Sequence, residues 1–84
     1  MKAVRAETKE KQIKVLEILE LEGYRWCLGQ KPTEYVPYER NGPESNYIKI
    51  DEYKKILKTA TKLYPGQEEI PYDQFISKNK KVIL

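Results

Sequence analysis

Residues 7–38, ETKEKQIKVLEILELEGYRWCLGQKPTEYVPY, decide the fold. Thr8 is a suitable N-cap, because its hydroxyl can accept a hydrogen bond from a free amide of the first helical turn. The apolar residues that follow recur at helical spacing, and Gly23 supplies the left-handed stop. The stretch therefore predicts a helix over Thr8–Glu22. Its apolar positions cover more than half of the circumference, so we expect this helix to be largely enclosed or to meet a second surface.

After the helix, apolar and polar residues alternate over Tyr24–Leu28 and stop at Gly29, which is the pattern of a half-buried strand. Shorter signals lie outside this region. They predict strands at Lys2–Ala6, Tyr47–Ile50 and Val82–Leu84, and one helical turn at Asp73–Ile76.

The stretch 51–63 fits two structures. Its apolar spacing, from Tyr53 to Leu63, fits a helix capped by Asp51, and periodicity alone slightly favours that reading. The same residues also fit the turn and second strand of a hairpin that begins at Tyr47.

Between the second predicted strand and Tyr47, residues 29–46 contain three prolines and two glycines that interrupt regular structure. We expect a long loop here, and long ordered loops in small domains often carry function.

Together these elements predict one domain over residues 1–84 with an α+β fold, in which one main helix packs on a small, mostly antiparallel sheet of three to four strands. The predicted core consists of the inward apolar residues: Ile13, Leu16, Leu19, Trp26, Ile48, Ile50, Phe75 and Ile76.

The composition excludes several kinds of catalytic and metal-binding site. The 84 residues contain no His and a single Cys, so imidazole catalysis, His metal sites and cysteine pairs are excluded. The four glycines are isolated from one another and form no phosphate-binding loop. We expect no enzyme activity and no cofactor. A single Cys27, with no apolar run long enough for a membrane span or a signal peptide, predicts a cytoplasmic protein without membrane contact.

Seven tyrosines in so short a chain are the compositional excess that bears on function. Tyr35, Tyr38, Arg40 and Tyr47 lie in or beside the proline-containing loop, and Tyr and Arg recur at binding hot spots. We predict a partner-binding surface there, with truncation of Tyr38 or Arg40 weakening the partner and sparing stability. The alternative is a loop that these residues pin onto the core.

The 16 Lys and Arg are interleaved with 13 Asp and Glu. A basic patch is a second candidate surface, formed by Lys49, Lys54, Lys55, Lys58 and Lys62. The alternative is a set of solvated lysines that prevent edge-to-edge pairing of strands.

Three segments, Gly23-Tyr24-Arg25-Trp26 with Gly29, Tyr47–Ile50 and Glu69–Ile76, resemble small accessory proteins of tailed phages and prophages. The resemblance favours the hairpin for residues 51–63 and transfers no active site. Together with the missing catalytic groups, the wide apolar arc of the first helix and the tyrosine-rich loop, it predicts a protein that binds and modulates a host protein in the host cytosol, as an inhibitor or adaptor, with counter-defence as one such role. Nucleic-acid binding through the Lys and Tyr residues is an alternative. An oligomer that sequesters a signalling nucleotide at a subunit interface is another.

Overall fold

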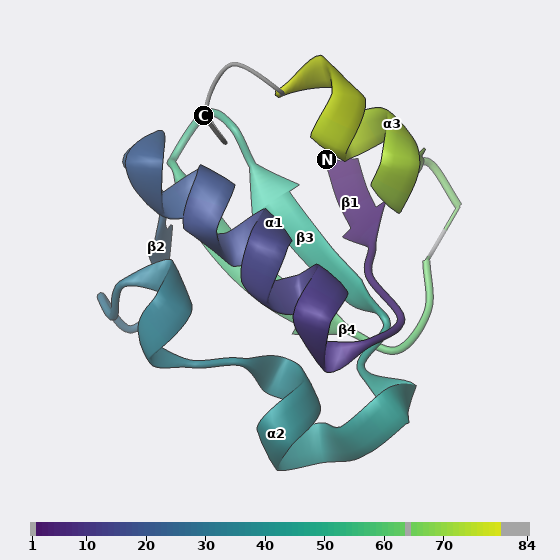
Figure 1. Cartoon of the computed structure of the whole chain (residues 1–84). Helices are drawn as coiled ribbons and strands as arrows, with labels where there is room; N and C mark the ends of the chain where they lie inside the picture. Colours follow the sequence, from purple (N-terminus) through teal and green to yellow (C-terminus); the bar gives the residue numbers. More distant parts are fainter. Residues whose placement is uncertain (1, 64, 80–84) are drawn as a thin grey trace.

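A computed structural model describes residues 2–63 and 65–79. They form a mixed sheet with helices α1 and α3 on one face (Figure 1). The strands are β1 Lys2–Arg5, β2 Arg25–Trp26, β3 Tyr47–Asp51, β4 Ile56–Ala60 and β5 Glu68–Pro71. The α-helices are α1 Lys9–Leu21, α2 Pro37–Asn41 and α3 Tyr72–Lys78, and there are 3-10 turns at Pro32–Glu34 and Gly42–Glu44. The fold is α+β, as predicted; the predicted strand Val82–Leu84 lies outside the described residues.

Helix α1 begins and ends where the sequence predicts. The amide of Lys11 donates to Thr8 Oγ1 at 3.2 Å, which satisfies a donor that the first turn leaves free. Gly23 follows the helix at φ +90°, a conformation that side chains with a Cβ rarely adopt. The chain can therefore turn back at once toward the sheet.

Within the described residues the sheet has five strands, in the order β2-β4-β3-β1-β5. Strand β3 pairs antiparallel with β1 and β4, whereas β1 pairs parallel with β5 and β2 pairs parallel with β4. The predicted three to four mostly antiparallel strands are thus only an approximate description. The predicted strand Tyr24–Leu28 is shorter in the structure, where β2 has two paired residues, and β5, Glu-Glu-Ile-Pro, was not predicted because it carries little apolar signal.

Residues 51–63 form a hairpin with β3, not a helix. Asp51 pairs with Ile56 at the end of the ladder, and its Oδ1 accepts hydrogen bonds from the amides of Tyr53 and Lys54 at 3.1 Å each. Lys55 completes the turn at φ +59°. The side chain that could have capped a helix instead closes the turn, which is why local sequence left both structures open.

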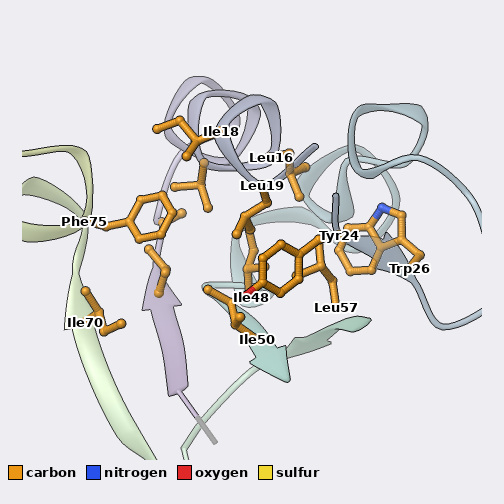
Figure 2. Close-up of a cluster of buried hydrophobic side chains, with 13 residues drawn as sticks. Leu16, Ile18, Leu19, Tyr24, Trp26, Ile48, Ile50, Leu57, Ile70 and Phe75 are labelled. Carbon is orange, nitrogen blue, oxygen red and sulfur yellow. The ribbon is translucent and has the colours of Figure 1, made fainter. Parts of the chain in front are cut away.

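The core lies between the sheet and the two helices. Figure 2 shows it as one cluster that runs from Phe75 and Ile70 at one end to Trp26 and Leu57 at the other. Six of the eight predicted core residues are buried; Ile13 and Ile76 are half-buried. Ile13 lies at the margin of the α1 stripe, and Ile76 packs against the edge of the cluster.

Candidate binding groove

The candidate site lies at the edge of strand β4 that points away from β3. Strand β2 pairs with only Ile56 and Leu57, at the beginning of β4. The remaining residues, Lys58 to Ala60, have no strand partner on this side within residues 2–63 and 65–79. Half of the β4 edge is therefore open.

Backbone geometry identifies the groups on this open edge. The amide of Arg25, in β2, donates to the carbonyl of Lys55 at 3.1 Å. Alternate residues of a strand direct their N–H and C=O groups to the same edge, so Leu57 and Thr59 face the same way as Lys55. Because β2 stops at the partner of Leu57, the N–H and C=O of Thr59 face outward beside a vacant strand position.

A hollow of about 490 Å3 lies next to this open edge. Residues of three segments line it: Trp26 of β2 with Cys27, Leu28 and Gln30 after it, Tyr35 and Arg40 from the loop region, and Leu57, Lys58 and Thr59 of β4. The segment at residues 30–40 forms one wall and β4 the other.

The aromatic floor of this hollow is fixed in place. Trp26 is buried, and its Nε1–H donates to the carbonyl of Pro32 at 3.0 Å. The ring of Tyr35 meets it edge to face, with centroids 5.2 Å apart and planes at 81°. This is a favourable aromatic geometry. Leu28 lines the same hollow with 83% of its surface exposed, so an exposed apolar side chain accompanies the fixed aromatic pair.

A second hollow, of about 510 Å3, continues along the same edge. It is lined by Glu44, Ser45, Lys49, Thr59, Ala60, Thr61 and Lys62. Thr59 lines both hollows, which makes them neighbours on either side of it. We call the two hollows together, with the residues that line them, the edge groove, and residues 30–46, which face β4 across it, its far wall.

The edge groove is cationic. Among the described residues that line it, four are Lys or Arg and one is a carboxylate, Glu44. Lys49 and Lys58 lie directly opposite each other on β3 and β4, an arrangement that like charges disfavour. Arg40 and Lys58 make no ion pair with the described residues.

A buried glutamine positions the far wall of the groove. Gln12, on α1, is fully buried, and its Nε2 donates to the carbonyls of Ala6, at 3.1 Å, and of Ser45. Its Oε1 accepts from the amide of Tyr38 at 2.9 Å. One side chain thus ties the beginning of α2 and Ser45, two residues before β3, to the main helix.

A carboxylate holds the other end of this wall. Glu20 Oε1 accepts hydrogen bonds from both the amide of Thr33, at 3.0 Å, and the Thr33 hydroxyl. These bonds, with smaller contributions from the charges of Lys31 and Arg25, lower the pKa of Glu20 below the ordinary value for glutamate, against a weaker opposing effect of burial.

The pKa of Glu20 is lower in the folded than in the unfolded chain. The stabilising bonds to Thr33 are therefore fully present at a pH above the pKa of the unfolded chain, and they are lost as the pH falls through the pKa of the folded chain. We expect the Thr33 amide resonance to titrate with a pKa below that of free glutamate and to shift little in a Glu20→Gln variant. A Thr33 amide that is insensitive to acid in the parent chain contradicts this contact.

Of the four residues that the sequence predicts for partner binding, the structure places two in the edge groove and two outside it. Tyr35 and Arg40 both line the edge groove. Tyr38 is half-buried and does not line it; its backbone is held by Gln12. Tyr47 lies on β3, where its hydroxyl donates to Glu69 Oε1 at 3.0 Å. Burial, and then this bond, raise the pKa of the Tyr47 hydroxyl above its ordinary value.

The five lysines of the predicted basic patch also lie in two different places. Lys49, Lys58 and Lys62 line the edge groove. Lys54 and Lys55 lie in the β3–β4 turn, and the Lys55 ammonium lies 4.6 Å from the ring centre of Tyr24, a cation–π contact. The turn lies at the other end of β4 from Lys62, so the five do not form one continuous surface.

Several groove residues escaped sequence reasoning. Leu28 looked like the inward end of a strand, but the chain turns after Trp26, where the amide of Gly29 donates to the Trp26 carbonyl at 2.8 Å. Gly29 was the available signal for that turn. Thr59 and Gln12 gave no signal, because an open strand edge and a buried amide both depend on residues distant in sequence.

Comparisons with protein-family models, with curated proteins and with solved structures found no match to this chain. Within the described residues, no helix is long and apolar enough to cross a bilayer. Those residues also contain no group of three or more Cys, Asp or Glu side chains placed to hold a metal ion.

Proposed function

We propose that this chain is a non-catalytic accessory protein that binds and modulates another protein, its partner segment occupying the edge groove. The phage resemblance suggests that the partner is a host protein and that binding takes place in the host cytosol. The observation that carries the proposal is the meeting of a rigid Trp26–Tyr35 floor and exposed Leu28 with the cations Arg40 and Lys58 beside an open strand edge.

Each part of this surface has a counterpart in known interface chemistry. Fixed aromatic side chains provide contact area at a low entropic cost, and Arg is enriched at hot spots. An exposed leucine beside a buried Trp provides an apolar contact that water leaves readily. The wall at residues 30–46 is already ordered by Gln12 and Glu20, so little ordering remains for the bound state.

Affinity capture with three versions of the chain tests this proposal. The groove variant combines Leu28→Ser with Arg40→Glu. The control variant combines Leu21→Ser with Lys14→Glu, since Leu21 is also an exposed leucine, at 71%, and Lys14 is an exposed cation on the same helix, α1. We expect a partner protein that the parent and the control retain and that binds the groove variant roughly tenfold or more weakly. Equal recovery with all three versions contradicts the proposal.

Nucleic-acid binding is the second candidate function. The observation in its favour is that Lys49, Lys58 and Lys62 all line the edge groove. Against it, none of the described residues that line the second hollow is aromatic, and Lys54 and Lys55 lie apart. A gel shift at about 50 mM salt with single-stranded and duplex oligonucleotides tests it, because phosphate contacts strengthen as salt is lowered. No retardation at that salt removes this candidate.

A further inference from the structure

The open half of β4 indicates how a partner would bind. We propose that the partner segment is an extended, acidic peptide that adds to the sheet as a strand beside Lys58–Ala60, taking the position that β2 leaves vacant. This inference rests on the proposed function and makes it specific: it names the conformation of the partner and its chemistry.

The backbone supplies the first argument. A strand edge with free N–H and C=O groups is a template for another strand, and peptide recognition by strand addition uses such edges. Thr59 is the central residue of the open half, and its two backbone groups face the groove. A strand laid there would hydrogen-bond to Thr59 and extend the sheet beyond the short β2.

Proteins usually protect such an edge. Long edge strands are commonly covered or interrupted, whereas here the protection consists of Lys58 and a groove wall set back from the strand. The wall at residues 30–40 leaves a hollow of about 490 Å3 rather than packing against β4. Space for an additional chain is thus already present beside the edge.

Side chains supply the second argument. Alternate side chains of an added strand would point to the two faces of the sheet. Those on the face of Trp26, Leu28 and Tyr35 meet apolar surface, which selects one bulky apolar residue. Those near Arg40 and Lys58 meet cations that no described carboxylate neutralises, which selects Asp or Glu.

The same charges argue against a second copy of this chain as the occupant. Two edge grooves brought together would place Arg40, Lys58 and Lys62 of one copy near those of the other, since all three line the same edge. Like charges across an interface oppose association. An acidic peptide would instead meet Arg40 and Lys58, which make no ion pair with the described residues.

Selection from a displayed library of random linear peptides of about ten residues, the length of a long strand, tests this inference on the folded chain. We expect enriched sequences to combine Asp or Glu with a bulky apolar residue. In the complex with the tightest peptide, we expect the Thr59 amide to become protected from hydrogen exchange. This measurement needs no substitution, so it does not depend on any variant folding.

A pair of substitutions at one position separates backbone from side-chain binding. Thr59→Pro removes an N–H that faces away from β3, a place where edge strands tolerate proline. Thr59→Val keeps that N–H and removes only the hydroxyl. We expect proline to weaken the peptide roughly tenfold, the value of one lost hydrogen bond with its desolvation, and valine to leave the affinity within about twofold.

The outcomes distinguish the two proposals. If enriched peptides lose affinity for the groove variant but leave the Thr59 amide unprotected and bind Thr59→Pro as tightly as the parent, the groove binds protein and strand addition is wrong. If no peptide is enriched, or if the groove variant and the parent bind peptides equally, the proposed function fails as well. Binding of a random-sequence oligonucleotide in place of any peptide also overturns both.

Discussion

Replacing Leu16 with alanine should lower the free energy of unfolding by about 2–5 kcal/mol, the range for removing a large aliphatic side chain from a packed core. Leu16 is fully buried in the cluster between α1 and the sheet (Figure 2). Small domains are stable by only about 5–15 kcal/mol, so this loss is a large part of the total. Urea unfolding followed by Trp26 fluorescence measures it.

A second leucine of the same helix is the matched control. Leu21 ends α1 and keeps 71% of its surface exposed, so Leu21→Ala should change the free energy of unfolding by no more than about 0.5 kcal/mol. The contrast between the two leucines tests the orientation of α1 and not merely its existence. Equal effects at both positions would mean that the helix presents a different face to the sheet.

Local sequence sufficed for features that neighbouring residues determine. The helix from Thr8 to Gly23 needs only a cap, an apolar stripe and a left-handed stop, and all three lie within the segment itself. The stripe is wide because α1 also contacts the loop segment: the 3-10 turn Pro32–Glu34 and helix α2 pack against it. The second surface that the width predicted is this segment.

Sequence could not place the elements whose stability comes from distant partners. Strand β5 has one buried residue, Ile70, and exists because it pairs in parallel with β1, more than sixty positions earlier. Residues 30–46 read as irregular, yet Pro32 and Pro37 each begin a short helix, because proline is well suited to the first helical position. Short helices of this kind carry no periodic signal.

The candidate site also combines residues that the sequence identified with a feature that only the structure reveals. Tyr35 and Arg40 were found from composition, since aromatic and cationic residues in a proline-containing loop suggest an interface. The other half of the groove is a strand edge, which depends on β2 stopping after Trp26. A strand's sequence does not reveal how long its neighbour will be, so the open edge could be seen only in the structure.

The second large effect is expected from substitution of the buried Gln12. A Gln12→Leu substitution should lower the free energy of unfolding by about 2–4 kcal/mol, although leucine fits a buried helical position by size and polarity. The amide of Tyr38 and the carbonyls of Ala6 and Ser45 all lose their partner, and each buried group left unsatisfied costs about 1–3 kcal/mol, partly recovered where water can enter. The matched control is Lys14→Leu, which places the same residue at an exposed position of α1 and should be nearly neutral.

The location of the damage separates this variant from Leu16→Ala. Loss of Leu16 weakens the central cluster, so amide protection from hydrogen exchange should fall throughout the sheet and α1. Loss of the Gln12 amide releases the wall at residues 36–46 first, so protection of the Tyr38 amide should fall well before that of Ile48. Because that wall bounds the edge groove, folded Gln12→Leu protein should also bind a groove peptide more weakly than the parent. A variant that loses stability uniformly and keeps full peptide affinity would show that Gln12 supports the core alone and that the wall is held by other contacts.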